Sequence, residues 1–192
     1  MDINLIVVDN FLEYPDSVRE SGILGLKQIH TKNLKFYPGV RSEKADEEYQ
    51  NYIKNKFEKI LNVKITQWDS NITRWTGEEV ETDSSCFQLC TEDAKTWIHV
   101  DPCEWTAILY LSPNPVIDSG TAIYKHKTTN KFKMTEQECA NSEGDWDIIN
   151  FVGNVYNRCI LMKGNLCHRS LIPGFGNDIE SGRLTQVFFF NT

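Results

Sequence analysis

Two histidines and one aspartate in the C-terminal half of the chain could together hold a metal ion. His99 and Asp101 are separated by one residue, and His168 follows much later. Side chains at i and i+2 of a strand project to the same face, so His99 and Asp101 can reach one ion from one strand. Pro102 favours extended geometry at Asp101, because the residue before a proline avoids the helical region. Two imidazoles and one carboxylate leave about three coordination positions open, as is typical of non-haem Fe(II) oxygenases.

The triplet is not decisive alone, because a chain with 4 histidines and 27 acidic residues can contain such a triplet by chance. The alternative is a strand end at which His99 hydrogen-bonds near the surface. Other polar groups further along the chain favour the metal site.

A cationic and a hydroxyl side chain begin the last apolar stretch of the sequence. Arg183 and Thr185 share one face of the strand that contains Leu184–Phe190. A planar guanidinium binds a carboxylate through two parallel hydrogen bonds, which a lysine cannot do. The alternative for Arg183 is a surface ion pair with Asp178 or Glu180.

Tyr110 offers a phenol to the same carboxylate from the strand that follows Asp101; its alternative is a core tyrosine. The triplet Ser119-Gly120-Thr121 begins the next strand, where a glycine permits close packing of the backbone. These groups could form one pocket with the arginine.

The elements that must position these groups begin with a helical N-terminal third. A short strand, Ile3–Val8, precedes a helix that starts near Pro15, where a first-turn proline fits. A second helix covers Glu43–Leu61 and carries its apolar side chains on one stripe. The segment Lys32–Gly39, which contains proline and glycine, joins the two helices as a loop.

The rest of the chain is predicted to be mainly β-structure. Turn residues separate short β-type runs at Val63–Thr73, Ser85–Cys90, Thr96–Asp101, Thr106–Leu111, Thr121–Tyr124, Arg158–Met162 and Leu184–Asn191. Many short strands with polar turns indicate a sandwich or jelly roll. The fold class is therefore α+β, mainly β. The segment Lys125–Tyr156 is too long for a hairpin loop and is predicted to be a lid-like insertion.

The order of these motifs resembles the 2-oxoglutarate- and Fe(II)-dependent dioxygenases, in particular the prolyl-4-hydroxylase-like branch. The resemblance covers about Ser85–Thr192, and its matching stretches are Ile98–Asp101, Ile108–Ser112, Ser119–Thr121, Asn157–Leu161, His168 and Gly182–Thr185. It implies a double-stranded β-helix (a jelly roll) braced by the N-terminal helices, with iron at one mouth. The chain would form one oxygenase domain over 1–192, with helical support in 1–62, a jelly-roll core in 63–192 and the lid at about 125–156.

Carried over position by position, the resemblance implies that the iron ligands are His99, Asp101 and His168. Arg183 would pair with the distal carboxylate of 2-oxoglutarate, assisted by Thr185 and Tyr110. Relatives usually hold the metal-chelating carboxylate through a residue upstream of the H-x-D strand, and Gln88 is the nearest candidate here.

The chemistry that the resemblance implies is hydroxylation of an aliphatic C–H bond. The 2-oxo acid would take two of the open positions on Fe(II) and O₂ the third, giving succinate and CO₂, with ascorbate in a supporting role. Related halogenases replace the carboxylate ligand with a small residue, so Asp101 favours hydroxylation. The branch suggests a prolyl or other amino-acid residue in a peptide as substrate, although a free amino acid fits as well.

Composition and charge exclude several other classes. With 20 basic and 27 acidic residues the formal charge is −7, so general nucleic-acid binding is not expected. No apolar run approaches the roughly 18–20 residues needed to cross a bilayer, and no basic signal peptide precedes the first strand. The six cysteines then predict free thiols and a cytoplasmic protein.

Two alternatives stay open. A structural zinc site could use the four residues Cys86, Cys90, His99 and Cys103, although zinc ligands usually come in tighter pairs on turns. A non-catalytic jelly-roll module could bind peptides or glycans on tryptophans that border the site mouth, for which the candidates are Trp75, Trp105 and Trp146.

Overall fold

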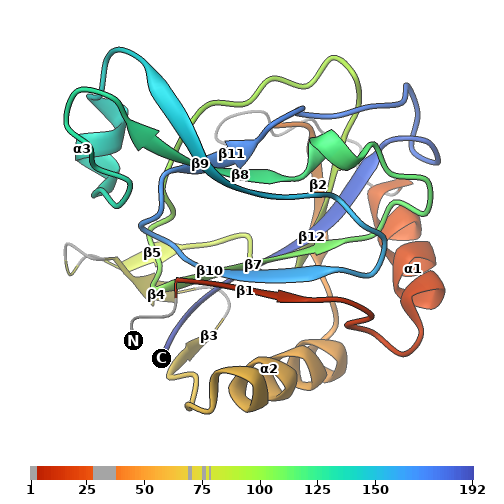
Figure 1. Cartoon of the computed structure of the whole chain (residues 1–192). Coiled ribbons are helices and arrows are strands. Elements are labelled where there is room, and N and C mark those ends of the chain that lie inside the picture. The colour runs from red at the N-terminus through yellow and green to blue at the C-terminus, as the bar shows by residue number, and fades with distance from the viewer. Residues whose placement is uncertain (1–3, 28–37, 69–70, 75–76, 78) are drawn as a thin grey trace.

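The computed structural model describes residues 4–27, 38–68, 71–74, 77 and 79–192. Two antiparallel sheets face each other in it, and they confirm the predicted jelly-roll class (Figure 1). The major sheet runs, in spatial order, through β1 (Leu5–Val8), β10 (Cys159–Lys163), β7 (Trp105–Tyr110), β12 (Arg183–Asn191), β6 (Cys86–Cys90) and β2 (Val40–Lys44), with β3 (Gln67–Trp68) beside β12. The minor sheet consists of β11 (His168–Ser170), β8 (Thr121–His126) and β9 (Trp146–Val152).

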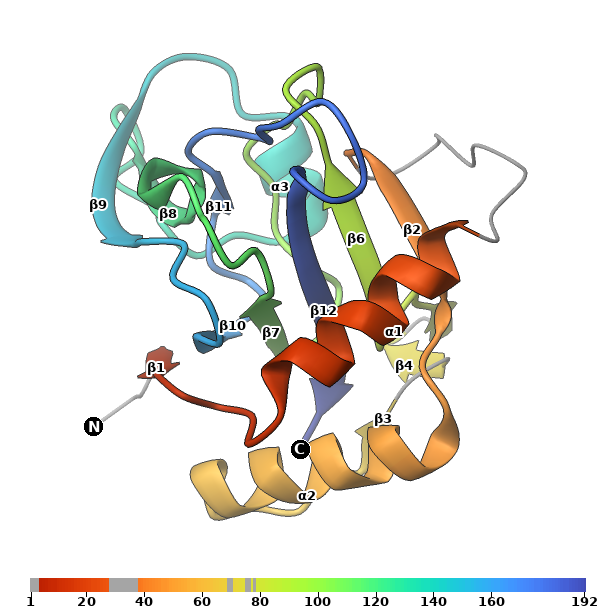
Figure 2. The same cartoon turned by 90° about the vertical axis from the view of Figure 1, so that its right-hand side faces the viewer.

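Three further pieces complete the fold. Helices α1 (Pro15–Lys27) and α2 (Glu47–Leu61) cover the face of the major sheet that points away from the minor sheet, as Figure 2 shows. A two-stranded ribbon pairs β4 (Asn71–Thr73) with β5 (Glu79–Glu81). The 3₁₀ turn η1 (Ile117–Ser119) leads into β8, and the short helix α3 (Glu136–Ala140) lies between β8 and β9. Among the described residues no helix is long and apolar enough to cross a membrane.

Strand β12 divides its side chains between the core and the site. Phe188 and Phe190 lie against Phe57 of α2, with ring centroids 5.4 Å apart in each pair. The alternate residues, Arg183, Thr185, Val187 and Phe189, line a cavity between the two sheets. A period of two along the strand produces this division. One buried strand therefore anchors the helices and presents polar groups to the site.

Helix α2 begins later than the sequence predicted. Asp46 caps it and accepts a hydrogen bond from the Tyr49 amide at 2.9 Å, so the helix starts at Glu47 and not at Glu43. Residues Val40–Lys44 instead form β2 on the edge of the major sheet. Of the predicted loop Lys32–Gly39, residues 32–37 lie outside the described residues.

Several strand predictions also need correction. The run 63–73 is divided between β3 and β4. Residues 96–101 do not form a ladder; they are held by a single bridge between His99 and His168. The segment 125–156 is less insertion-like than predicted, because it contains α3 and the whole of β9. Strand β9 lies at a sheet edge with Ile148 and Ile149 exposed, so its sequence lacks the alternation that marks a half-buried strand.

Candidate metal centre

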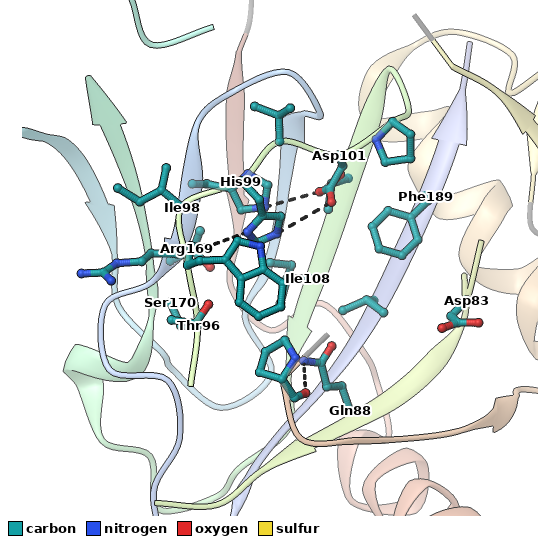
Figure 3. A pocket seen from close by; sticks show the side chains of 18 of the residues that line it. Asp83, Gln88, Thr96, Ile98, His99, Asp101, Ile108, Arg169, Ser170 and Phe189 are labelled. Atoms are coloured by element: carbon teal, nitrogen blue, oxygen red, sulfur yellow. Dashed lines mark hydrogen bonds and ion pairs between the residues drawn. The ribbon is translucent and has the colours of Figure 1, made fainter. Parts of the chain in front are cut away.

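A cavity of about 850 Å³ opens between the two sheets and contains the residues singled out for metal binding. Figure 3 shows His99 and Asp101 pointing toward each other at one end of it, with Gln88 at the other side. The segment before β7 supplies His99 and Asp101, and the first residue of β11 supplies His168. The backbone groups of His99 and His168 exchange two hydrogen bonds, at 3.0 and 2.8 Å, which fix the two segments side by side.

The three side chains converge on one point. The Nε2 atom of His168 lies 3.4 Å from Oδ2 of Asp101, and Nε2 of His99 lies 3.9 Å from Oδ1. The two imidazole centroids are 4.4 Å apart. One ligand atom from each residue lies within 4.8 Å of the others, which suits a shared metal ion. The sequence predicted a strand over residues 96–101, and this was wrong, because only His99 forms an isolated bridge. Extended backbone at residues 99–101 nevertheless brings His99 and Asp101 to the same point.

Both imidazoles are held in the tautomer that a metal ligand needs. Nδ1 of His99 lies 3.0 Å from the Trp97 carbonyl oxygen, and Nδ1 of His168 lies 2.8 Å from the Leu166 carbonyl oxygen. Because a carbonyl only accepts, each Nδ1 carries the hydrogen and each Nε2 offers its lone pair to the cavity. Such an outer hydrogen bond is the usual support of a ligating histidine.

Burial lowers the pKa of His168, and a hydroxyl group orients the carboxylate of Asp101. Desolvation and the neighbouring His99 ring lower the pKa of His168 to about 4, against the opposing effect of Asp101, so its ring is neutral at pH 7. Thr106 Oγ1 donates a hydrogen bond of 2.5 Å to Oδ2 of Asp101 and fixes the carboxylate. Two imidazoles that point Nε2 into the cavity, a fixed carboxylate and partial burial fit a divalent transition metal of the Fe(II) class.

Arg183 is a buried cation that no acidic side chain neutralises among the described residues. It is only 4% exposed, and its Nε donates to the Ser119 carbonyl at 2.8 Å. The sequence alternative does not occur, because Glu180 pairs with Arg19 on the surface and Asp178 accepts from Ser181. The guanidinium lines the cavity and can therefore take an anionic ligand there.

Three of the residues predicted to contact the cosubstrate, Gln88, Thr185 and Tyr110, lie in one row across the major sheet, and Arg41 extends this row. Register pairs Arg41 with Gln88, Gln88 with Thr185, and Thr185 with Tyr110. Gln88 donates to the Pro38 carbonyl at 2.9 Å and accepts from Arg41 Nε at 3.1 Å, so its amide orientation is fixed. Thr185, Gln88 and Arg41 line the cavity.

Tyr110 lies behind the cavity wall. Its side chain is completely buried, its hydroxyl is 2.8 Å from Thr121 Oγ1, and burial raises its pKa. Thr121 is the residue of this pair that reaches the cavity. The backbone approach that brings it there requires a glycine, because a Cβ on Gly120 would lie 2.0 Å from the Val152 carbonyl oxygen. The sequence predicted that Tyr110 contacts the ligand directly. In the structure Tyr110 instead supports Thr121, and Thr121 reaches the cavity.

Sequence reasoning missed several cavity residues, among them Thr106, Arg41 and Trp97. Thr106 becomes visible only when the strands are paired. Arg41 lies between the predicted loop and the predicted helix, and its position on β2 places it over the cavity. Trp97 is 51% exposed and lines the cavity; its spacing of two from His99 on an extended chain was a signal that could have been used.

The zinc alternative does not form. None of the six cysteines is in a disulfide, and Cys90 and Cys103 donate to the carbonyl oxygens of Pro38 and Trp105. Burial raises the pKa of the Cys103 thiol, which disfavours the thiolate that zinc binds. His99 is instead grouped with Asp101 and His168.

The tryptophans proposed for the site mouth are also revised. Trp105 belongs to the core, where Lys163 lies over its ring, and Trp146 packs edge-on against His126. Trp75 lies outside the described residues. Trp97 is the exposed tryptophan that borders the cavity within the described part of the chain.

Comparison with known proteins places the chain in a family. A profile of a family of unknown function, DUF6445, matches residues 2–146. The chain belongs to this family. No curated protein matches the sequence significantly.

Solved structures resemble this DUF6445 member in fold. A prolyl hydroxylase from Trichoplax adhaerens, in complex with a hypoxia inducible factor oxygen degradation domain peptide fragment, superposes with a TM-score of 0.56 at 12% identity, covering 97% of this chain and 83% of that one. HygX from Streptomyces hygroscopicus with iron bound gives a TM-score of 0.54 at 14% identity, covering 97% and 81%. The chain therefore shares the jelly-roll fold of these two proteins. Membership of the dioxygenase superfamily and of its prolyl-4-hydroxylase-like branch stays a prediction.

Proposed function

We propose that this protein is an Fe(II)- and 2-oxoglutarate-dependent dioxygenase that hydroxylates an aliphatic C–H bond. One observation carries the proposal: two Nε2 atoms and a carboxylate converge in the same cavity as a buried guanidinium without an acidic partner among the described residues. A metal and a dicarboxylate would satisfy both features at once.

The iron ligands in this proposal are His99, Asp101 and His168. When bound, Fe(II) would supply the activation of O₂, coupled to decarboxylation of 2-oxoglutarate to succinate. The chain's own part is to orient two imidazoles and a carboxylate, which the Trp97 and Leu166 carbonyls and the Thr106 hydroxyl do. An aspartate among the ligands favours hydroxylation over halogenation.

The binding of 2-oxoglutarate is assigned to the end of the cavity near Arg183. Its guanidinium would form two parallel hydrogen bonds to the distal carboxylate, with Thr185 beside it and Tyr110 acting through Thr121. Gln88, with its amide orientation fixed, is the candidate for the carboxylate that chelates the metal.

The substrate is proposed to be a prolyl or other amino-acid residue in a peptide, or a free amino acid. One structural neighbour holds a peptide fragment. The cavity volume of about 850 Å³ lies in the upper part of the range of ligand sites, so it can admit a side chain besides the cosubstrate. Trp97 offers an exposed aromatic face at the mouth, and Cys139 and Ala140 of α3 close one side in a lid-like manner.

The proposal treats residues 1–192 as one oxygenase domain that works in the cytoplasm. Six cysteines without a disulfide are typical of a reducing compartment. The N-terminal helices pack on the major sheet, which agrees with a supporting role for residues 1–62.

The test is production of succinate from 2-oxoglutarate with Fe(II), O₂ and ascorbate, over a panel of peptides and amino acids. Wild type should form succinate slowly without substrate and faster with the right one. The His99→Ala, Asp101→Ala and His168→Ala variants should lose this turnover while keeping the fold, whereas Asp93→Ala, which removes an exposed carboxylate, should not. Retained turnover in two of the three ligand variants would contradict the site. No turnover, and no absorbance band when iron and 2-oxoglutarate are mixed anaerobically, would favour a non-catalytic binding module.

A further inference from the structure

Two cysteines lie together behind the metal ligands and have no part in the function proposed above. Cys139 of α3 and Cys167, the residue before β11, belong to one buried cluster. Cys139 Sγ lies 3.7 Å from the Ile98 carbonyl oxygen, and the backbone of the next residue, His99, bridges that of His168, which directly follows Cys167. Both are unpaired thiols, although the residues are 28 positions apart and come from different elements.

The pair has one accessible and one enclosed member. Cys139 lines the cavity and keeps 7% of its surface exposed, whereas Cys167 is completely buried. A small oxidant that enters the cavity would therefore meet Cys139 first. Cys167 is placed to attack the oxidised sulfur from inside. A thiol that a small oxidant can reach through a cavity, beside a resolving thiol, is an arrangement suited to redox-responsive cysteines.

Each cysteine is also coupled to a metal-ligand segment. Cys139 donates a hydrogen bond of 3.7 Å to the Ile98 carbonyl, next to His99. Cys167 precedes His168 directly, and its own backbone is held by the Phe132 carbonyl and the Tyr124 amide. A change in the distance between the two sulfurs would therefore move the two segments that carry His99 and His168.

We propose that Cys139 and Cys167 form a reversible disulfide that weakens metal binding. One hydrogen peroxide oxidises Cys139 to the sulfenic acid and releases one water. The Cys167 sulfur then attacks the Cys139 sulfur, the S–S bond forms and the hydroxyl leaves as a second water. The two thiols lose two hydrogens in all, and both peroxide oxygens are reduced. Dithiothreitol reverses the change by thiol–disulfide exchange.

Bond formation must shorten the sulfur separation to about 2.05 Å, which requires α3 and the segment before β11 to approach each other. Helix α3 is only five residues long, so it can move more readily than the sheet. The approach removes the hydrogen bond to Ile98 and displaces the chain at His168. Disturbing the support of a ligand typically costs about 10- to 100-fold in metal affinity, and the loss expected here is of that size. This consequence rests on the metal site of the proposed function, whereas the disulfide itself does not.

The first experiment maps the bond. Reduced protein is treated with hydrogen peroxide in small molar excess, alkylated with N-ethylmaleimide and digested for mass spectrometry. Wild type should lose two of its six reactive thiols after unfolding and give a Cys139–Cys167 cross-linked peptide. Cys139→Ser and Cys167→Ser should not form it, whereas Cys159→Ala, which removes a core thiol, should form it normally. A different cross-link, or sulfinic acid at Cys139 without a cross-link, would overturn the proposal.

The second experiment measures anaerobic Co²⁺ binding before and after oxidation. Oxidised wild type should bind Co²⁺ about 10- to 100-fold more weakly, with recovery in dithiothreitol, and Cys139→Ser should be insensitive to peroxide. An unchanged dissociation constant in cross-linked protein would overturn the coupling. If reduced wild type binds no Co²⁺, the metal site and its coupling both fail, and the mass spectra alone decide the disulfide.

Discussion

Replacing Arg183 should strongly weaken cosubstrate binding without destabilising the protein, and this combination separates a ligand anchor from a structural ion pair. The guanidinium is 4% exposed and has one hydrogen bond, to the Ser119 carbonyl. A buried ion costs several kcal/mol to desolvate, and here no carboxylate of the described residues offsets that cost. Arg183→Met removes the charge and keeps most of the volume. The lost hydrogen bond to Ser119 costs about 1 kcal/mol, so the unliganded variant should be at least as stable as wild type.

The effect on 2-oxoglutarate should be large. Truncating one partner of a buried, hydrogen-bonded charge pair costs about 2–5 kcal/mol, so Arg183→Met should weaken binding about 30- to several-thousand-fold. Arg183→Lys keeps the charge but loses the second of two parallel hydrogen bonds, and about 1.5–3 kcal/mol then corresponds to roughly 10- to 150-fold.

The assay is calorimetric titration of 2-oxoglutarate into anaerobic metal-loaded protein, with thermal unfolding of the unliganded variants in parallel. Arg169→Met is the matched control, because Arg169 lines the same cavity but donates its Nε hydrogen to the Tyr124 hydroxyl. A loss of 3 kcal/mol or more in the stability of Arg183→Met would assign Arg183 a structural ion pair. An equal loss of 2-oxoglutarate affinity in Arg169→Met would refute the assignment of the anion site.

Three further changes test the supports of the site and the fold. Thr106→Val removes the hydrogen bond to Asp101 in an isosteric side chain and should weaken Co²⁺ binding about 10- to 100-fold; an unchanged titration would deny the threonine a role. Burial raises the pKa of Glu104, but hydrogen bonds from Lys163 and Thr192 outweigh this and lower it. The ionised carboxylate therefore stabilises the fold above its unfolded pKa of about 4.3. Urea unfolding of Glu104→Gln should therefore show a loss of about 1 kcal/mol at pH 7 that disappears as the pH falls through the lowered pKa, and a loss independent of pH would contradict it. Asn157→Ala leaves the buried amide and carbonyl of Leu12 without partners and should cost about 2–4 kcal/mol in the same assay, whereas a cost below about 0.5 kcal/mol would show that water replaces the side chain.

Features with a local cause could be predicted from the sequence. Helix α1 begins at Pro15 because proline suits the first turn, and the apolar run in β12 is long enough to identify a buried strand. The spacing of His99 and Asp101 also survives, since it needs only extended backbone between them. In each case the deciding interaction lies within a few residues of the feature itself.

Features decided by pairing could not be predicted in this way. Strand β2 was missed because its five residues, VRSEK, show no strand pattern: Glu43 and Lys44 were assigned to the helix and Val40–Ser42 to no element, and only its register with β6 makes it a strand. Strand β9 is exposed on both faces, so pairing with β8 and not hydrophobicity defines it. Tyr110 was expected in the cavity because its type suits a carboxylate, but the close approach of the backbone at Gly120 brings Thr121 in front of it.

The metal site combines both kinds of feature, which explains why so little of its support was visible in the sequence. His99 and His168 each donate Nδ1–H to the carbonyl of the residue two positions earlier. A backbone acceptor of this kind requires no particular side chain, so no motif records it, and the tautomer follows from the local chain path alone. The carboxylate is supported differently: Oδ2 of Asp101 accepts a hydrogen bond from the side chain of Thr106, five residues later on β7. The histidine geometry should therefore tolerate changes in nearby side chains, whereas this support of Asp101 is lost with the Thr106 hydroxyl.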